Sequence, residues 1–523
     1  MFTHAPVLAI AAPLLIAFAT PLLGKINERL RDFSVALAVL FSFACIIQLG
    51  GKILPDGGPL TYVLGASSVG LTLPSGYEVP VRVLLEVDAL SFLMGLTASI
   101  LFVAAGLYSF SHRNWRQVEI DSKFYALFLL LFAGVLGLVF TGDIFNMFVF
   151  LEITSIAACG LIGFNLDRGT SQEAAFKTLA IYTVGALLFL FAVGIMYGQH
   201  NALNLAYLAG ELDYGFLDKV ALALFAVSLI MKVGLVPVHL WVPDAYGEAA
   251  APASAVLVAN TLAGLYALYR ICFSLYGVTL NSTTAGWILT TVGVVSIFVG
   301  VSMAFLQNRL KRLIAYCALS QVGYMALGTG VGLTLLGSRQ LPNYAFTALQ
   351  GGIFHLFNDA LYMALLFLVA DAVIIVTGKR NLDLIGGLAR EMKWTAGFAL
   401  VGVGAIAGLP PFNGFASKLM IYESVFRLNP LLAIVAIIGS IMTLAVLARL
   451  FYGAFLGPAL PSMEGVREVP LPMKLAMGLL SLSIILLGLF PGLALDHLIE
   501  PASRALLEQK HYIDAVVALG GGG

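Results

Sequence analysis

The sequence carries little charge and lacks the common motifs of soluble enzymes. Only 11% of its 523 residues are charged, whereas soluble domains have roughly 25%, and 60% are hydrophobic. It contains no Walker loop, no GxSxG or HExxH sequence, and no recognisable motif for haem, flavin or an iron–sulfur cluster. Lysine plus arginine and aspartate plus glutamate number 28 each, so no basic face points to nucleic acid. We therefore expect a multi-pass membrane protein without a cofactor.

Cysteine is also scarce, and its placement argues against a metal centre. The four cysteines lie in apolar segments and show no CxxC or Cys/His spacing. We interpret them as small buried hydrophobic residues rather than metal ligands or disulfides. The sequence thus predicts no metal and no catalytic centre, and it leaves open whether the chain belongs to a redox-driven enzyme. The cysteines are Cys45, Cys159, Cys272 and Cys317.

Long apolar runs predict an all-α protein with about 14 transmembrane helices, because about 20 apolar residues cross a bilayer as a helix. When these spans alternate in direction, most lysines and arginines fall on the loops of one side. Positively charged loops stay inside, which favours an even number of spans with both termini outside. The expected spans are 5–23, 31–49, 86–109, 124–141, 144–164, 176–197, 219–242, 251–275, 286–305, 313–331, 346–376, 394–426, 431–455 and 472–493.

Two of these spans contain a break and a lysine. Gly234 and Pro237 follow Lys232, and the run 408–414, rich in glycine and proline, precedes Lys418. A break frees backbone groups that lipid cannot satisfy, so it must face protein or a wet cavity. A lysine inside the membrane is costly and is by default a functional candidate. Paired broken spans are typical of ion-translocating proteins that are built from two related halves.

Glu152 is the strongest carboxylate candidate, because its sequence neighbours are mostly apolar. Burying a carboxylate without a partner is expensive, so we expect a lysine to pair with it, either Lys177 or Lys232. A proton gained or lost nearby would then decide whether the pair holds together. The alternatives are a purely structural ion pair for Glu152, and a Lys177 side chain that reaches the membrane surface.

Two histidines are further candidates for proton transfer. His239 follows the first break and is either a proton relay or a satisfied polar group. His355 and Asp359 are four residues apart on one helix face, where the carboxylate would stabilise a protonated imidazole. Their alternative role is a hydrogen bond between helices. Glu248 lies in a short inside loop, where we expect solvent exposure.

Four segments together resemble one family, although no single segment would suffice. They are residues 141–152, 232–245, 310–324 and 408–418, and the likeness covers nearly the whole chain. The family comprises the antiporter-like membrane subunits of respiratory complex I, Mrp-type cation/proton antiporters and group 4 membrane-bound hydrogenases. The sequence around Asp143 and Glu152 looks most similar to the D-type subunit of Mrp antiporters and its hydrogenase counterpart.

The resemblance implies two inverted five-helix repeats in which the seventh and twelfth spans are broken. It places a proton path through the membrane centre on Glu152, Lys177, Lys232 and Lys418. The expected divisions are N-terminal helices over 1–123, a first repeat over 124–275, a second repeat over 286–455, and a final helix and tail over 456–523.

The sequence departs from the family pattern between the two halves. Many members carry a lysine where this chain has Leu262, and a histidine and a lysine where it has Asp359 and Met363. Water held by Asn260, Thr261 and Tyr266 is one way to bridge this gap, and His355 with Asp359 is another. Otherwise the path between the halves is incomplete.

We therefore predict a subunit that moves protons, or exchanges cations for protons, in a multisubunit complex of the inner (cytoplasmic) membrane. Its partners would be other membrane subunits, lipid, and protons or sodium ions. One alternative is a proton-pumping subunit of a membrane-bound hydrogenase or a complex I-like enzyme. A second is a scaffold subunit that has lost transport, and a third is a solute transporter that acts alone.

Overall fold

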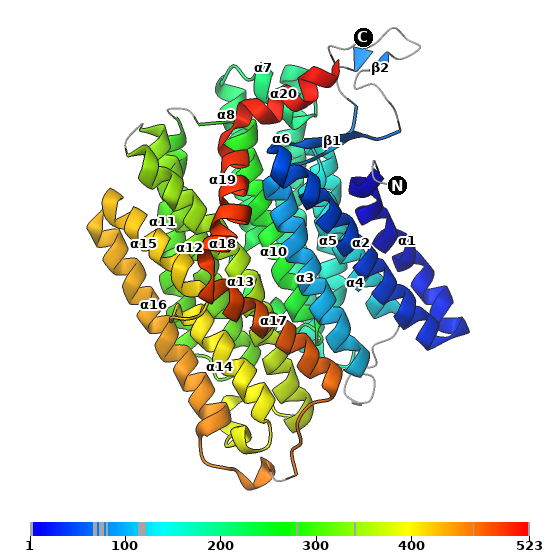
Figure 1. Ribbon diagram of the computed structural model, residues 1–523, viewed down its shortest axis with the longest axis vertical. Coiled ribbons are helices and arrows are strands. Elements are labelled where there is room, and N and C mark those ends of the chain that lie inside the picture. Colours follow the sequence, from blue (N-terminus) through cyan, green and yellow to red (C-terminus); the bar gives the residue numbers. More distant parts are fainter. Residues whose placement is uncertain are drawn as a thin grey trace.

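The computed structural model describes residues 4–65, 71–72, 78–79, 82–112, 122–278, 281–338, 341–463 and 465–520. Within them the chain forms a tall bundle of helices (Figure 1). Helix α7 and the last helix α20 lie at one end of the bundle, called here the α7 end. The opposite end, which holds the loop before α14, is called the α9 end because the half-helix α9 lies towards it.

The N-terminal part contributes three long helices and short strands at the α7 end. Strand β1 pairs antiparallel with β4, so that Thr61 lies opposite Glu86. Asn27 caps α2 by accepting a hydrogen bond from the backbone of Arg29. The elements are α1 (Ala5–Ile26), α2 (Glu28–Asp56), β1 (Leu60–Val63), β2 (Leu71–Thr72), β3 (Glu78–Val79), β4 (Leu84–Val87) and α3 (Ala89–His112).

The first five-helix repeat contains a broken fourth span. Helix α8 ends at Val233, where Gly234 adopts the left-handed conformation (φ 79°) that commonly closes a helix. The chain resumes as the half-helix α9. The elements are α4 (Ser122–Phe140), α5 (Ile144–Ile162), α6 (Gly169–His200), α7 (Leu205–Glu211), α8 (Phe216–Val233), α9 (Trp241–Glu248), α10 (Ala253–Tyr269) and the π-helical turn η2 (Arg270–Leu275).

The second repeat follows the same order, and its fourth span is also broken. Helix α14 ends at Ala407, Gly408 is again left-handed (φ 75°), and α15 begins at Gly414. Five spans are an odd number, so the second repeat enters the membrane from the opposite side. The elements are α11 (Asn281–Phe305), α12 (Leu310–Gly337), α13 (Pro342–Thr377), η3 (Leu382–Leu384), η4 (Leu388–Arg390), α14 (Lys393–Ala407), α15 (Gly414–Leu428), α16 (Pro430–Phe451) and η5 (Tyr452–Leu456).

The C-terminal segment is helical throughout most of its length. After α17 the chain runs up the side of the bundle to the α7 end (Figure 1). The tail after Pro491, which is too polar for a further complete span, packs on α3, α13 and η2. The elements are η6 (Pro461–Met463), α17 (Leu471–Leu489), α18 (Pro491–Ala494), η7 (Leu495–Ile499), α19 (Glu500–Leu507) and α20 (Gln509–Gly520).

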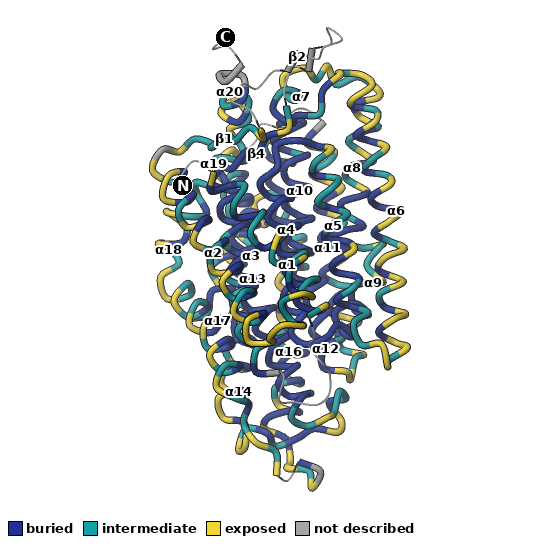
Figure 2. Tube along the Cα trace, turned by 90° about the vertical axis from the view of Figure 1, so that its right-hand side faces the viewer, coloured by how far each residue is buried: buried dark blue, intermediate teal, exposed yellow. Residues whose placement is uncertain are grey.

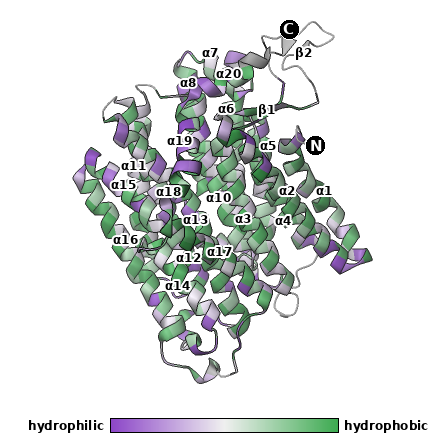
Figure 3. Ribbon diagram, viewed as in Figure 1, coloured by the Kyte–Doolittle hydropathy of each residue, from purple (hydrophilic) through white to green (hydrophobic). Residues whose placement is uncertain are grey.

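The predicted membrane fold is confirmed. Among the described residues, 12 helices are long and apolar enough to cross a bilayer. The two broken spans, α8 with α9 and α14 with α15, complete the expected set of about 14. Burial is highest at the centre, with 94% of the spanning window buried in both α10 and α12 but only 28% in α1. Figure 2 shows the exposed residues on the outer helices, and Figure 3 shows that hydrophobic residues predominate along the helices of the bundle.

Candidate functional site

Lys232 lies at the first helix break and is only 5% exposed. Its ammonium group donates to Ser155 Oγ at 2.9 Å and to Thr154 Oγ1 at 3.1 Å, both on α5. The nitrogen also lies 3.9 Å from the centre of the Tyr182 ring, a cation–π contact. Its stem crosses Gly264, where an added Cβ would approach Lys232 Cγ to 3.1 Å. The lysine is thus held by neutral groups.

The expected ion pair of Glu152 is not formed with either lysine. Glu152 is near enough to Lys232 for a charge–charge interaction, yet its Oε1 is buried without a hydrogen-bond partner in the described part of the chain. The cause is helix geometry. Lys232 contacts the face of α5 that carries Leu151, Thr154 and Ser155. Glu152 follows Leu151 and is therefore rotated about 100° around the helix, away from this face.

Lys418 lies just after the second break and is 2% exposed. Its ammonium group donates to the Ile406 carbonyl at 2.7 Å and to Ser440 Oγ at 3.0 Å. The nitrogen lies 4.8 Å from the centre of the Tyr324 ring. Its stem crosses Gly408, where an added Cβ would approach Lys418 Cδ to 3.0 Å. Both lysines therefore combine neutral oxygen ligands, a tyrosine ring and a glycine beneath the stem.

His355 and Asp359 are both buried on α13, but they are not bonded to each other. His355 Nδ1 lies 3.0 Å from Ser417 Oγ, next to Lys418, and its Nε2 lies 3.3 Å from the Tyr362 hydroxyl. Asp359 Oδ1 has no hydrogen-bond partner among the described residues. The histidine thus belongs to the second break, whereas the carboxylate faces the gap between the halves.

The gap between the halves is nearly closed. A small cavity lies there, and the space open to the centre of a water molecule is about 10 Å³. A single water needs about 10–15 Å³ by the same measure, so the space is at the lower limit for one molecule. Of the three expected bridging residues, only Thr261 lines it. Asn260 bonds to Tyr182, and Tyr266 bonds to Arg270. The lining is Val233, Gly234, Val242, Tyr246, Val258, Thr261, Leu262, Ala318, Leu319, Val322, Asp359 and Met363.

Lys177 lies towards the α9 end, and its side chain is 47% exposed. It pairs with Glu173 at 2.6 Å and with Asp244 of α9 at 3.2 Å. His239 lies in the first break, and its Nδ1 is buried without a partner in the part of the chain that the structure describes. Neither residue joins the hydrogen bonds of Lys232, so their role in translocation stays a prediction.

A group of cations that the sequence did not single out holds α9 in place. Arg309 reaches Glu248 at 3.0 Å, Lys311 donates to the Ala249 carbonyl at 2.8 Å, and Arg312 reaches Asp244 at 3.0 Å. We call these contacts the α9 clasp. Arg380 adds a second bond to Glu248 at 2.7 Å. Glu248 is buried, so the expectation that it is solvated is wrong, because these cations cover it.

Lys311 also forms a buried ion pair with Asp371 of α13, at 2.9 Å. Replacing Asp371 with leucine is expected to destabilise the protein by about 3–5 kcal/mol, because it leaves a buried cation without its anion. Adding Lys311→Met to Asp371→Leu should recover most of this loss. Thermal unfolding in detergent tests both variants. A double variant no more stable than Asp371→Leu would contradict this account.

The described residues contain no group of three or more histidine, cysteine, aspartate or glutamate side chains that could hold a metal ion. The four cysteines are free. The buried lysine, histidine and carboxyl side chains of this arrangement can gain and lose protons, and hydroxyl groups lie beside them.

Comparison with solved structures supports the fold. The chain is similar to one in the structure of the membrane-bound sulfane sulfur reductase, an archaeal respiratory membrane complex (TM-score 0.85, 28% identity, 98% of this chain and 100% of that one). The Mrp complex from Dietzia sp. DQ12-45-1b also matches (TM-score 0.85, 24% identity, 99% of both chains). Respiratory complex I from Thermus thermophilus matches with a TM-score of 0.79 at 22% identity, over 97% of this chain and 99% of that one.

Sequence relatives point to the same family. The NADH-quinone oxidoreductase subunit N of Desulforudis audaxviator is 32% identical, and the match covers 96% of this chain and 99% of the relative. The A-type subunit of the Na(+)/H(+) antiporter of Alkalihalophilus pseudofirmus is 29% identical over 95% of this chain, which spans 63% of that longer relative. Residues 141–443 match the family described as NADH:quinone oxidoreductase/Mrp antiporter, TM, and the chain belongs to this family.

Proposed function

We propose that this chain is the proton-translocating subunit of a multisubunit complex in the cytoplasmic membrane, most like an Mrp-type antiporter subunit. One observation carries the proposal: Lys232 and Lys418 are both buried at helix breaks and bound by neutral oxygen atoms. An ammonium group without an anion in contact is costly inside the membrane, so a proton can leave it without breaking an ion pair. A strongly paired lysine would hold its proton more tightly.

Buried polar atoms without partners support a hydrated path around these lysines. Native structures leave few buried polar groups unbonded, and such groups commonly bind water. In the described residues these atoms occur on α5, α10, α12, α13 and at both breaks. They include Glu152 Oε1, His239 Nδ1, Asn260 Oδ1, Ser320 Oγ, both polar atoms of Gln321, Asn358 Oδ1, Asp359 Oδ1 and both polar atoms of Asn413. We propose that Glu152, His239, His355 and Asp359 exchange protons with water on this path, and that Lys177 serves it from the α9 end.

Two other functions have specific support. Similarity to part of a quinone oxidoreductase, and to a chain of a respiratory reductase, favours a pump driven by redox partners. The small cavity beside Leu262 and Met363 favours a scaffold in which the two halves do not exchange protons. The likeness to a D-type Mrp subunit stays a prediction.

The test is to purify the complex that contains this chain, identify its companion proteins, and reconstitute it in vesicles. Imposing a sodium gradient should drive proton movement if the complex is an antiporter. A redox-driven pump should instead respond only to its electron donor and acceptor. A complex with native companions that moves protons under neither condition would contradict the proposal and favour the scaffold.

A further inference from the structure

A second group of buried charges lies at the α7 end, outside the lysine path. Glu86 on β4, Asp88 before α3 and Arg270 on η2 are 1%, 3% and 1% exposed. They join the N-terminal part to the first repeat. Tyr512 of α20 closes the group, since its ring centre lies 5.2 Å from the Arg270 guanidinium. The C-terminal tail thus covers a charged cluster that it would otherwise leave open.

The cluster has two carboxyl groups and one guanidinium, and the guanidinium is in contact with only one of the carboxyl groups, that of Asp88. Arg270 Nη2 binds Asp88 and Ser91, and its Nε donates to the Tyr266 hydroxyl at 2.8 Å. Its Nη1 donates to Ser274 at 3.2 Å. Arginine stays charged, so Asp88 is its counter-ion. Glu86 is left without a matching cation in contact.

Within the described residues, Glu86 has only a weak interaction with the Tyr512 hydroxyl in place of the missing ion pair. Neither of its carboxyl oxygens has a partner among the described residues, although the Tyr512 hydroxyl lies nearby. Its Oε2 faces Gly142, and a Cβ added to that glycine would lie 3.1 Å from this oxygen. An ionised carboxylate that is buried and unbonded costs far more than a neutral acid, so the group takes up a proton instead.

The groups around Glu86 agree with this conclusion. The titratable and charged side chains that interact with it are Arg270, Asp88 and Tyr512. Burial raises the pKa of Glu86 well above its usual range, and the positive charge of Arg270 lowers it only in part. The negative charge of Asp88 acts in the same direction as burial.

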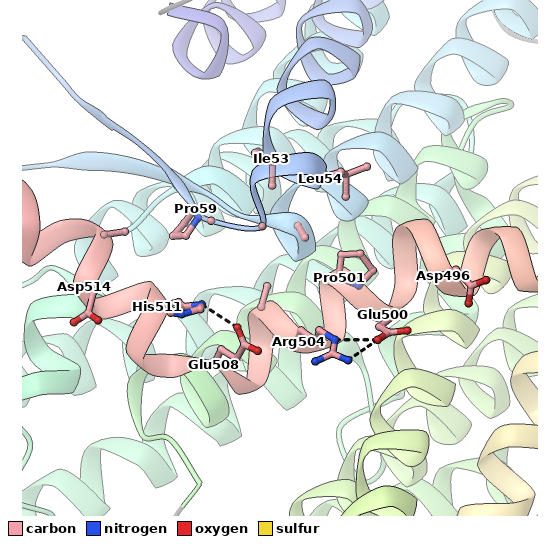
Figure 4. Close-up of a pocket in the computed structure, with 15 residues that line it drawn as sticks. Ile53, Leu54, Pro59, Asp496, Glu500, Pro501, Arg504, Glu508, His511 and Asp514 are labelled. Atoms are coloured by element: carbon pink, nitrogen blue, oxygen red, sulfur yellow. Dashed lines mark hydrogen bonds and ion pairs between the residues drawn. The ribbon is translucent and has the colours of Figure 1, made fainter.

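A water-accessible pocket lies beside the cluster. Its volume is about 670 Å³ for water centres, and Ala89, the residue after Asp88, forms part of its wall. Figure 4 shows its polar lining from the tail, where Glu500 binds Arg504 and Glu508 binds His511. His511 lines the pocket and the next residue, Tyr512, is buried against the cluster. Helix α20 thus lines the pocket with His511 and reaches the cluster with Tyr512.

We propose that Glu86 is a proton-binding site at the α7 end of this protein, and that it exchanges its proton with water in the tail pocket past Tyr512. The place of this site in transport rests on the proposed function. On release, the O–H bond of Glu86 breaks and the proton passes to pocket water. The carboxylate left behind is then stabilised by Arg270, and uptake reverses these steps.

Infrared difference spectra of the assembled complex, taken between acidic and alkaline buffer, test the site directly. The native complex should show carbonyl bands of protonated, buried carboxyl groups, and one of these bands should belong to Glu86. Glu86→Gln should lose that band and slow proton transport about 100-fold, the usual contribution of a positioned proton donor or acceptor. Glu391→Gln, which changes an exposed carboxyl before α14, is the control and should alter neither.

The outcomes separate this site from the proposed function. Carbonyl bands that are identical in the native complex and in Glu86→Gln overturn the proton-binding site. A lost band with native transport overturns the exchange route. A lost band in a complex that transports no protons even in native form keeps the site and refutes the proposed function. If Glu86→Gln does not assemble, Tyr512→Phe keeps the ring and removes the hydroxyl. It should slow transport about tenfold while keeping the band, and a native rate would overturn the route past Tyr512.

Discussion

Replacing Lys232 with alanine is expected to reduce coupled proton transport by about 100-fold or more while leaving the complex assembled. The ammonium group is the only charged side chain that the structure places in contact with Thr154 and Ser155, within the described residues. Its loss removes the proton carrier and leaves two hydroxyl groups that remain bonded to α5 itself. Transport in reconstituted vesicles, driven by the native energy source, is the measurement.

Lys393→Ala is the matched control for that experiment. Lys393 is exposed at the start of α14, and its loss should leave transport unchanged. The protein composition of the purified complex establishes that both variants assemble. A fully assembled Lys232→Ala complex that transports at the native rate would show that this lysine is structural.

Replacing Asp359 with asparagine is expected to have an effect of similar size, about 100-fold on transport. Asp359 is the one ionisable carboxyl side chain that lines the small cavity between the halves, as far as the structure describes them. Its Oδ1 lacks a partner, so asparagine fits the same space with no ion pair to break. The readout is again proton transport by the assembled complex.

Leu262→Lys is the companion to that variant. Leu262 lines the same cavity, so the new ammonium group would lie near Asp359 and could pair with it. If a single water already bridges the halves, the rate should change only modestly. Transport that appears in Leu262→Lys when the native chain has none would support the scaffold function. Native transport in Asp359→Asn would exclude this carboxylate from the path.

The sequence predicted the elements of the fold because composition and periodicity decide which segments cross a bilayer. The breaks after Lys232 and before Lys418 were also predictable, because glycine readily adopts the left-handed conformation that ends a helix and proline cannot donate a backbone hydrogen bond. Gly234 and Gly408 both adopt the left-handed conformation at these breaks. Glycine and proline end a helix through local backbone conformation, so the neighbouring sequence is enough to predict the position of each break.

The partners of the charged residues could not be predicted in the same way. Lys232 binds Thr154 and Ser155 instead of Glu152 because of the rotation of α5 about its axis, which depends on packing with the neighbouring helices. Lys177 meets Asp244, 67 residues away in sequence, because the break lets α9 lie beside α6. The spacing of residues along one sequence does not reveal how each helix is rotated about its axis or which helices lie side by side.

Arg270 was not among the candidate residues of the sequence analysis, although it is among the largest fully buried side chains. Its counter-ion, Asp88, lies 182 residues earlier, and the tail that covers it comes near the end of the chain. A charged residue in an otherwise apolar helix end was the one available signal. Sequence order offers no means of choosing which distant carboxylate would meet it.

The α9 clasp has a mechanical consequence. Three cations within four consecutive residues, Arg309 to Arg312, belong to the second repeat, yet they grip the half-helix of the first. A tilt of α9 would have to break these bonds together or carry α12 along with it. We therefore expect the two repeats to stay in contact at the α9 end during any relative motion. Any separation of the two halves would then be greatest at the α7 end, where the π-helical turn and the tail lie.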